Sequence, residues 1–590
     1  MIKVSDYIAQ RLCRHYGIKD MFMVSGGGAM HLNDSFGKCM NYICCHNEQA
    51  CSIAAEGYAR SLGNKLALVN VTTGPGGLNA LNGVFGSWTD SAPVLFISGQ
   101  VKFSTTLASC PDIPLRQLGD QEVDIISVVK PLTKYAAMIT DVNTVKYHLD
   151  RAVWEATHNR FGPVWLDVPM NIQGALMDEN TQKEFTPPLP RTYDLKIDEV
   201  IKKLTAVKRP LIVAGHGIRL GGQIEAFHEL LNKLDFPVVT TFNGYDVIEN
   251  GHKNYIGRIG TIGQRAGNFA LQNADCILFL GTRNNIRQAS YNWENFAAKA
   301  FKIIVDIDEA ELNKPTVKAD LPVHADLSAF LPALLEKTPK ITKTEWLNWC
   351  QERRQKYAPE TTPDHLSEEQ SINPYHFVYT LTSLMSENDI LVAANGSACV
   401  CTFQTGVVKQ GQRQFWNSGD ASMGYEPAAV GACIATGGKN TVCIAGDGSI
   451  MMNLQELQTI RHHNLPIKIF IINNDGYLSI KQTQNNFFEG RHCGDGRCSG
   501  VTLPDFQKIG NAFDIKSVRI KKTGEMEKVI KEVLAAKEPM ICEVIVNPDC
   551  TFSPKLSARK LDDGTMISPS LEDMYPFLPR DEFEKNIIND

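Results

Sequence analysis

Residues Thr441 to Leu478 have the sequence TVCIAGDGSIMMNLQELQTIRHHNLPIKIFIINNDGYL, and this stretch decides the fold. Its apolar, β-branched start, residues 441–445, predicts a buried strand, and residues 467–472 predict a second one. Between them, residues 451–463 carry Met452, Leu454, Leu457 and Ile460 at helical spacing. The stretch therefore predicts a strand, a crossover helix and a parallel strand, the unit of an open α/β sheet.

Each predicted strand is followed by a polar cluster, residues 446–449 after the first and residues 473–476 after the second. Ligands of open α/β sheets bind beyond the carboxyl ends of the strands, where glycines admit a bulky anion and helix N-termini offer N–H groups. The Asp447 carboxylate, the Asn474 amide and the Gly476 carbonyl can supply three oxygen ligands. Three hard oxygens together with diphosphate oxygens suit Mg²⁺. A strand-turn with helix-capping Asp and Asn is the structural alternative for a lone GDG.

Residues 449–472 separate GDG from NN, and this spacing resembles the motif of thiamine diphosphate (ThDP) enzymes. The resemblance implies ThDP and Mg²⁺ as cofactors, with Asp447, Asn474 and Gly476 as the metal ligands. It also implies coenzyme contacts from neighbouring turns. The implied coenzyme-binding set is Asn395, Gly396, Ser397, Ala421, Met423, Gly446, Asp447, Gly448, Ser449, Asn474, Gly476, Tyr477 and Leu478.

The 590-residue chain has 43% apolar residues, 21% charged residues and a net charge of −6, which is typical of a soluble globular protein. No basic run predicts nucleic-acid binding, no apolar stretch is long enough for a membrane span, and the first residues lack a signal-peptide layout. The cysteines lie mostly inside apolar runs, which predicts a reduced, cytoplasmic protein. His492, Cys493 and Cys498 have a spacing that is poor for zinc, so a loop with incidental cysteines is the preferred interpretation.

Residues 1–170 alternate predicted strands and helices and contain NEQA, AEGYAR, TTGPGGLNAL and DSAPVLFISGQV. These segments resemble the pyrimidine-binding (PYR) domain of the acetolactate synthase branch of ThDP enzymes. In that family, the Glu at the position of Glu48 hydrogen-bonds N1′ of the aminopyrimidine and shuttles a proton. The resemblance implies Glu48, Gly28, Gln100 and Met423 as catalytic residues. A solvated charge at a helix start is the structural alternative for Glu48.

Residues 171–190 form a proline-containing linker, and residues 191–345 form a second predicted α/β unit. GTIGQRAGNFA, ADCILFLGTR and IIVDID in this unit resemble the central domain of acetolactate synthases, which holds a flavin that does no redox work. FAD is therefore a candidate cofactor. The family's arginine-phenylalanine-acidic-acidic-arginine run is RNNIR at residues 283–287 here, so both arginines are kept and the acidic pair is not.

Residues 370–550 form a third predicted α/β unit, which resembles the diphosphate-binding (PP) domain of the family. There, the residue matching Met423 wedges between the two rings of the coenzyme, and the carbonyl matching Ala421 accepts from its 4′-amino group. The family has glycine at the latter position, and alanine is tolerated if φ is negative. Residues 551–590 are expected to form a tail that packs on the body over the active-site mouth. The predicted fold is thus three doubly wound parallel-sheet α/β domains, PYR, central and PP.

The resemblance implies ThDP- and Mg²⁺-dependent decarboxylation of a 2-oxo acid, with pyruvate first, and transfer of the acyl unit to a second carbonyl. His46, Gln100 and Gln121 are candidate polar groups of the pocket. The family's phenylalanine-glutamine-glutamate run is Asp120-Gln121-Glu122 here, which favours a polar acceptor such as a keto-sugar.

In this family, PYR of one subunit faces PP of another, which implies a homodimer or homotetramer with the active site between subunits. Two alternatives remain. A simple 2-oxo-acid decarboxylase is disfavoured because the first unit lacks the paired histidines of that branch. A non-catalytic protein on a ThDP fold is disfavoured because Glu48, Asp447 and Asn474 are all present.

Overall fold

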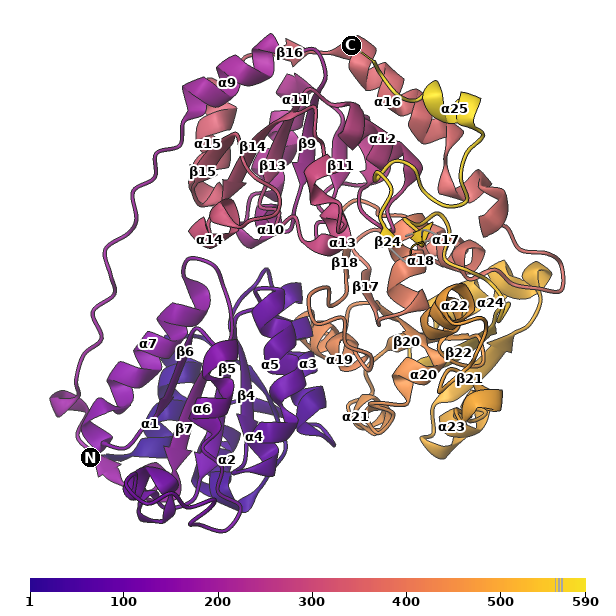
Figure 1. The fold of residues 1–590 in the computed structure, drawn as a ribbon. Helices are drawn as coiled ribbons and strands as arrows, with labels where there is room; N and C mark the ends of the chain where they lie inside the picture. Colours follow the sequence, from indigo (N-terminus) through magenta and orange to yellow (C-terminus); the bar gives the residue numbers. More distant parts are fainter. Residues whose placement is uncertain (558, 561–562, 564–565, 590) are drawn as a thin grey trace.

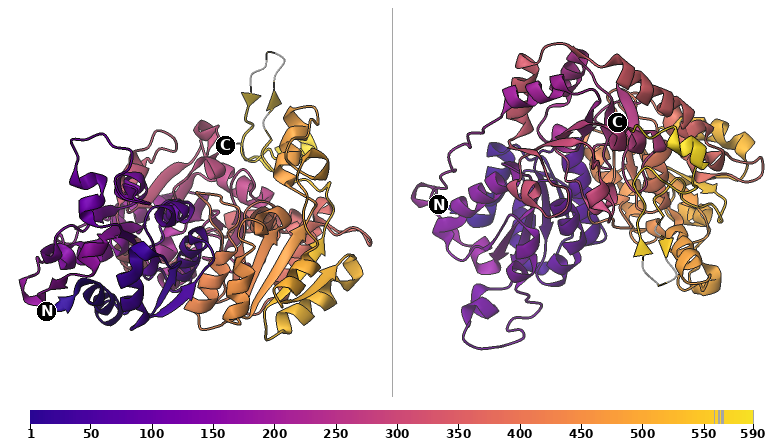
Figure 2. Two further views of the ribbon diagram at one scale, coloured as in Figure 1. Left: turned by 90° about the horizontal axis from the view of Figure 1, so that it is seen from below. Right: turned by 45° about the horizontal axis from the view of Figure 1, so that its top comes forward.

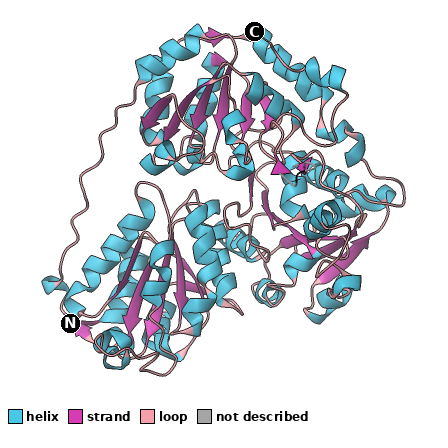
Figure 3. Ribbon diagram, in the orientation of Figure 1, coloured by secondary structure: helices cyan, strands magenta, loops and turns pink. Residues whose placement is uncertain are grey.

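The computed structural model describes residues 1–557, 559–560, 563 and 566–589. The chain forms three α/β domains, which we call the first, central and third domains (Figure 1). Each is built on one six-stranded sheet whose neighbouring strands are all parallel. Helices cover both faces of each sheet (Figure 3). The prediction of three doubly wound parallel-sheet domains is confirmed.

The first domain has the strand order β3-β2-β4-β5-β7-β6. Its strands are short and largely buried, because β-branched and aromatic residues fill both faces of a sheet that helices cover on both sides. The elements that position polar side chains are β2 Asp20–Met23, β3 Asn41–Cys44, α3 Glu48–Ser61, β4 Ala67–Val71, α4 Pro75–Asn79, α5 Leu81–Thr89, β5 Val94–Gln100, α6 Ile125–Val129, β6 Tyr135–Met138, α7 Val145–Thr157 and β7 Val164–Pro169.

The central domain has the strand order β12-β11-β9-β13-β14-β15 and follows an extended segment that runs along the outside of the molecule (Figure 1). Helix α16, Thr344–Lys356, leads from it to the third domain. Its other main elements are α9 Ile197–Ala206, β9 Pro210–Ala214, α11 Ile224–Lys233, β11 Val238–Thr240, β12 Tyr255–Arg258, α12 Arg265–Asn273, β13 Cys276–Leu280, β14 Phe301–Asp306, β15 Leu321–His324 and α15 Leu327–Lys337.

The third domain has the strand order β18-β17-β19-β20-β22-β21, so the two strands of the stretch quoted first lie side by side. Its main elements are α17 Pro374–Leu384, β17 Ile390–Ala393, α18 Ser397–Thr405, β18 Arg413–Phe415, α19 Pro427–Ala435, β19 Thr441–Gly446, α20 Asp447–Ile450, α21 Glu456–His462, β20 Ile467–Asn473, α22 Leu478–Phe487, α23 Phe506–Ala512, β21 Lys516–Ile520, α24 Thr523–Ala535 and β22 Met540–Ile545.

The single helix predicted over residues 451–463 is wrong in its first part. The structure has two shorter helices, α20 and α21, separated by a turn at residues 451–455. Asn453 uses its side-chain amide to donate to the Gly424 carbonyl at 2.6 Å, which ties this turn to another loop. Met452 is consequently exposed, whereas Leu457 and Ile460 are buried as predicted.

Helices α3 and α19 join the first and third domains at backbone contact. A Cβ atom on Gly57 would collide with the Ala428 carbonyl oxygen, and one on Gly431 would collide with the Ala54 carbonyl oxygen. Because Gly57 pairs with Ala428 and Ala54 with Gly431, the two helices run antiparallel. This contact fixes the separation of the two domains.

The C-terminal tail, 551–590, is hydrogen-bonded to the central domain. Asn268 donates to the Leu571 carbonyl at 3.0 Å, and Asn273 donates to the Asn586 carbonyl at 2.9 Å, both from α12. Two short strands, β23 Arg559–Lys560 and β24 Met566–Ile567, project from this tail (Figure 2). Residues 558, 561–562, 564–565 and 590 lie outside the described residues, and coverage of the active-site mouth by the tail stays a prediction.

Candidate active site

The carboxyl ends of β19 and β20 bring Asp447 and Asn474 together, because these parallel strands are direct neighbours. Asp447 Oδ2 accepts from the backbone N–H of Asn474 at 3.0 Å and of Gly476 at 3.1 Å. Asn474 Nδ2 contacts Ser397 Oγ at 3.3 Å, at the start of α18. We call Ser397, Asp447, Asn474 and Gly476 the 447 cluster.

Two features of the 447 cluster show that it is incomplete as a protein-only network. Asn474 Oδ1 is buried and has no hydrogen-bond partner within the described part of the chain. Asp447 forms no ion pair with any described residue, and burial raises its pKa to about 7 although four backbone N–H groups oppose this shift. A buried carboxyl without a cation and an unpaired amide oxygen beside it are a fitting ligand set for Mg²⁺.

The glycines around the 447 cluster have two different roles. Gly396 has φ of +81° and no atom within 4 Å of the position that a Cβ would take, and the nearest atom for Gly446 lies at 3.8 Å. These two positions leave space for a bulky anion. At Gly448 and Gly476, a Cβ would instead collide with the Tyr477 ring and with the Asp495 carbonyl oxygen. Here glycine is required by packing.

The other residues of the predicted coenzyme set surround this cluster. Ser449 Oγ accepts from the backbone N–H of Gly424 at 2.9 Å and donates to Glu426 at 2.9 Å, so its hydroxyl is occupied by protein groups. Asn395 Nδ2 donates to the Ser422 carbonyl at 3.3 Å, which links the end of β17 to the loop before α19. Tyr477 and Leu478 lead into α22.

Loop 417–423 is the segment between β18 and α19 that carries Ala421 and Met423. Ala421 has φ of +54°, so the condition for tolerating alanine in place of the family's glycine, a negative φ, is not met. Asn417 Oδ1 accepts from the backbone N–H of Asp420 and of Ala421, each at 3.0 Å, and this capped turn takes residue 421 into the left-handed region. A non-glycine residue there costs about 1–2 kcal/mol. Met423 is half-buried in the same loop.

Glu48 lies at the start of α3, at the carboxyl end of the first-domain sheet, and is buried. Its Oε2 accepts from Asn79 Nδ2 at 3.0 Å, and a Cβ on Gly76 would lie 3.5 Å from its Oε1. Both neighbours come from the turn and helix after β4. Gly28 lies beside this turn, since a Cβ there would collide with the Thr73 hydroxyl. The sequence prediction did not name Asn79, although TTGPGGLNAL contains it.

Gln100 is buried at the end of β5, and both donor positions of its side-chain amide are used by neighbouring protein groups. Nε2 donates to the Val123 carbonyl and to Asp167, each at 3.0 Å, and Oε1 accepts from the Val101 N–H at 3.0 Å. Burial raises the pKa of Asp167 to about 7. Gln100 thus connects the end of β5 to β7 and to the segment just before α6. Its catalytic role stays a prediction.

The three residues of the run Asp120-Gln121-Glu122 lie in different environments. Glu122 is buried and accepts from the backbone N–H groups of Leu107, Leu118 and Gly119, so it holds its own loop together. Asp120 and Gln121 are exposed. The Gln121 carbonyl lies against Gly74, in the turn that leads to Asn79.

One amide connects the neighbours of Glu48 and Met423. Asn82 Oδ1 accepts from Gln49 Nε2 at 3.2 Å and from Ser422 Oγ at 2.8 Å. His46 makes a second link, because its backbone N–H donates to Glu456 at 2.9 Å. Among the described residues, no hydrogen bond joins Glu48 itself to the 447 cluster.

Three family models match the chain in succession. Residues 2–128 match the N-terminal TPP binding domain of thiamine pyrophosphate enzymes, residues 197–334 match their central domain, and residues 395–544 match their C-terminal TPP binding domain. The chain belongs to the thiamine pyrophosphate enzyme family. This confirms the resemblance drawn from the sequence motifs.

Curated relatives of this thiamine pyrophosphate enzyme are acetolactate synthases. The acetolactate synthase large subunit of Lactococcus lactis subsp. lactis is 29% identical over 564 residues, covering 94% of each chain. The isozyme 2 large subunit of Escherichia coli is 29% identical over 559 residues, covering 90% of this chain and 94% of that one. Acetolactate synthase 1, chloroplastic, of Zea mays is 29% identical over 565 residues, covering 92% and 85%. The chain is an acetolactate synthase-like enzyme, as predicted.

This thiamine pyrophosphate enzyme has a cavity of about 120 Å³ between its first and central domains, and Ser418 of the third domain also contributes to its lining. It lies at the carboxyl ends of β9, β13 and β14, where His216 and Asp306 contribute to its lining. Both ring nitrogens of His216 are buried without a partner within the described part of the chain, and burial lowers its pKa well below the usual value. Burial raises the pKa of Asp306 to about 6. Orphaned buried polar atoms in a cavity at strand ends fit a nucleotide-type ligand such as FAD.

No helix of the described residues is both long and apolar enough to cross a lipid bilayer.

Proposed function

We propose that this enzyme decarboxylates a 2-oxo acid, pyruvate in the first instance, and transfers the resulting acyl unit to a second carbonyl compound. The observation that carries the proposal is the incomplete 447 cluster, in which a buried carboxyl without a cation lies beside an unpaired amide oxygen and open glycine positions. The names of the relatives reported above, which are acetolactate synthases, support the same reaction class.

The residues of the third domain would hold the coenzyme by its charged end. Asp447, Asn474 and the Gly476 carbonyl would bind Mg²⁺, and the space beside Gly396 and Gly446 would accept the diphosphate. Bound ThDP supplies the carbon nucleophile and the electron sink for decarboxylation. The Ala421 carbonyl and the Met423 side chain would fix the orientation of its rings.

Glu48 would exchange a proton with N1′ of the aminopyrimidine. Its carboxyl is buried and makes one hydrogen bond, to Asn79, and no cation lies beside it within the described residues. Asn79 would orient it by donating to Oε2. The remaining carboxylate oxygen, Oε1, lies 3.5 Å from the position that a Cβ would take on Gly76.

For the acceptor we propose a polar carbonyl compound such as a keto-sugar. The support is that Asp120 and Gln121 are exposed polar groups beside the turn that leads to Asn79, whereas Glu122 is consumed in holding its loop. An acceptor with hydroxyl groups could hydrogen-bond to both exposed side chains. A second molecule of pyruvate offers fewer partners for them.

Incubation with pyruvate, with and without a hydroxylated ketone such as dihydroxyacetone, tests these proposals. A carboligation product that contains the ketone supports the polar acceptor, and acetolactate alone supports the reaction class but contradicts that acceptor. Acetaldehyde as the only product would indicate a simple decarboxylase. The absence of any pyruvate consumption by protein loaded with ThDP and Mg²⁺ would contradict the proposed function.

We also propose FAD as the ligand of the cavity between the first and central domains. His216 and Asp306 supply hydrogen-bonding groups there, and Arg283 persists from the family's run although the acidic pair does not. The ultraviolet-visible spectrum of the purified protein, recorded before and after addition of FAD and desalting, tests this directly. Flavin bands that survive desalting support the proposal, and a protein that never retains flavin contradicts it.

The active site is proposed to form between subunits of a homodimer or of a homotetramer. Large apolar side chains are exposed on the first domain, at Phe85 and Trp88, and on the third domain, at Met451, Met452 and Phe487, which gives each domain a surface to bury. Mixing Glu48→Gln protein with Asp447→Asn protein, each inactive alone, should restore part of the activity only if one subunit supplies Glu48 and another supplies Asp447. No recovery after subunit exchange would contradict a shared site.

A further inference from the structure

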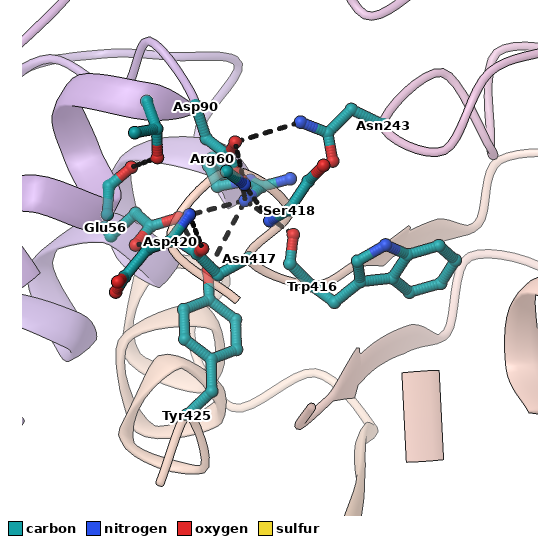
Figure 4. Close-up of polar contacts among 12 residues, drawn as sticks. Glu56, Arg60, Asp90, Asn243, Trp416, Asn417, Ser418, Asp420 and Tyr425 are labelled. Carbon is teal, nitrogen blue, oxygen red and sulfur yellow. Dashed lines mark hydrogen bonds and ion pairs between the residues drawn. The ribbon is translucent and has the colours of Figure 1, made fainter. Parts of the chain in front are cut away.

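A buried polar network joins all three domains directly beside loop 417–423 (Figure 4). Glu56, Arg60 and Asp90 enter it from the first domain, Asn243 from the central domain, and residues 416–425 from the third. Arg60 Nη1 donates to Glu56 at 2.9 Å, to the Trp416 carbonyl at 2.9 Å and to Asp90 at 3.3 Å. Sequence analysis did not identify this network, which we call the junction network.

Within the junction network, the Asp90 side chain binds the backbone of loop 417–423. Its Oδ2 accepts from the N–H of Ser418 at 2.7 Å, and its Oδ1 accepts from the N–H of Gly419 at 3.1 Å. Asn243 Nδ2 donates to Oδ1 at 3.1 Å and thereby ties the central domain to the same carboxylate. One side chain thus receives hydrogen bonds from every domain.

Further hydrogen bonds hold loop 417–423 closer to Ala421 and Met423, the residues assigned to coenzyme binding. Asn417 accepts from the N–H of Asp420 and of Ala421, and its own amide lies 3.4 Å from Glu56. Gly419 packs so closely on Thr89, the residue before Asp90, that a Cβ would collide with it. Ala421 lies two residues after Gly419, and Met423 lies four residues after it. A shift of the Asp90 contacts would therefore displace Ala421 and Met423 as well.

The chemistry at Asp90 suits such a holding role. A carboxylate that accepts backbone N–H groups in a buried site forms charge-assisted hydrogen bonds, which are about twice as strong as neutral ones. Its charge is compensated by Arg60, so the network does not require an external cation. An amide in its place would present one N–H₂ group to donors that now meet an acceptor.

We propose that Asp90 is a positioning residue for catalysis: it fixes loop 417–423 so that the Ala421 carbonyl and Met423 are held in place for the coenzyme. The inference rests on the roles proposed above for Ala421 and Met423. It goes beyond those roles because it assigns the positioning of Ala421 and Met423 to Asp90, a first-domain residue that has no proposed contact with ThDP.

Asp90→Asn is the variant that tests this, with Asp246→Asn as the matched control. Asp246 is another fully buried carboxylate at a domain boundary, where it accepts from Arg413 at 2.6 Å and from the Gln414 N–H at 2.9 Å. It does not bond to residues 417–423 in the described structure. Both variants should lower the melting temperature, so stability alone does not separate them.

Two measurements distinguish positioning from simple domain adhesion. In protein without coenzyme, amide hydrogen exchange of a peptide that contains residues 417–423 should become at least about tenfold faster in Asp90→Asn only. With ThDP and Mg²⁺ bound, exchange of the coenzyme's C2 proton should slow by at least about tenfold in Asp90→Asn and stay within about twofold in Asp246→Asn. In the decarboxylation assay, kcat should fall in Asp90→Asn while KM for pyruvate changes little, because the substrate groups are untouched.

Folded Asp90→Asn protein with amide exchange of the loop and C2 exchange within about twofold of the unmodified chain would overturn the proposal. Equal losses in both variants would overturn it as well, because they would reduce Asp90 to one of several domain contacts. The C2 exchange needs the coenzyme and no substrate. Failure of the proposed reaction, seen as no turnover of pyruvate by the unmodified chain, is therefore recognised separately from failure of this inference.

Discussion

Asp447 and Asp90 are buried to the same degree, with 2% and 3% of their surface exposed, and both accept hydrogen bonds from backbone N–H groups. They differ in charge balance. Asp90 has the Arg60 guanidinium at 3.3 Å, whereas Asp447 has no ion-pair partner among the described residues and a pKa raised to about 7 by burial. The polar atoms around Asp447 include the unpaired Asn474 Oδ1.

This difference separates a scaffold from a ligand site. A charge taken out of water has to be neutralised by a neighbouring charge, by a proton or by a bound ion. In the junction network, the protein supplies the neighbouring charge itself, and in the 447 cluster it does not. Glu48 belongs with Asp447 in this respect, since its one hydrogen bond comes from a neutral amide.

The largest effect is expected for Asp447→Asn. Loss of the carboxylate should weaken retention of Mg²⁺ and ThDP by more than about 100-fold and reduce turnover to background, since a direct ligand matters more than the residues that orient one. Equilibrium dialysis with Mg²⁺ and ThDP measures the retention. Asp246→Asn, with the same chemical change in an internally compensated site, should keep its coenzyme. Normal coenzyme retention by Asp447→Asn would remove the distinction between the two kinds of site.

Glu48→Gln should lower kcat by about 10²–10⁴-fold while ThDP still binds, because the amide keeps the shape but cannot take up or release the proton. Steady-state turnover of pyruvate and coenzyme content after gel filtration provide the two readouts. Near-normal turnover in this variant would refute the assigned role and move Glu48 to the scaffold side of the comparison.

Glu56 offers a pH test of the junction network. Burial raises its pKa to about 7, against the opposing effect of Arg60, from an ordinary value of 4.5. The folded state therefore holds this proton more tightly than the unfolded chain, and its contribution to stability is lost as the pH rises from about 4.5 through 7. The loss should be on the order of 1–3 kcal/mol. Glu56→Gln should flatten the dependence of melting temperature on pH in this range, and an unchanged slope would contradict the assignment.

The smallest effect is expected for Ala421→Gly. Glycine removes the cost of about 1–2 kcal/mol for a non-glycine residue at positive φ, and part of that gain is offset because glycine loses more freedom on folding. A net gain in stability below about 1 kcal/mol should appear as a slightly higher melting temperature. A lower melting temperature would show that the Ala421 methyl group packs more favourably than its backbone strain costs.

Local pattern was sufficient for the strands and for the residues at their ends. The apolar runs at 441–445 and 467–472 became β19 and β20, and the parallel pairing of these strands placed Asp447 beside Asn474. The helix between them was only half predicted. Helical spacing cannot reveal that Asn453 bonds to Gly424, a contact made between segments far apart in the sequence.

The parts of the site that escaped prediction depend on burial and on distant partners. Gln100 was chosen as a pocket group because of its motif, but its amide group is hydrogen-bonded to Val123 and Asp167. Glu122 belongs to the run from which a polar acceptor was predicted, but it accepts hydrogen bonds from nearby backbone N–H groups. Asp90 stood inside a recognised motif without a role, because its partners come from two other domains. Only the assembled chain shows which carboxylates are already satisfied.

The close contact of α3 with α19 is possible because Gly57 and Gly431 have a hydrogen atom where other residues have a Cβ. Glu48 begins α3 and Met423 lies shortly before α19, so the gap between the helix axes sets how far apart these two residues lie within one chain. A methyl group at either Gly57 or Gly431 would act as a wedge between domains. The spacing of the first and third domains within one chain thus depends on two positions that carry no side chain.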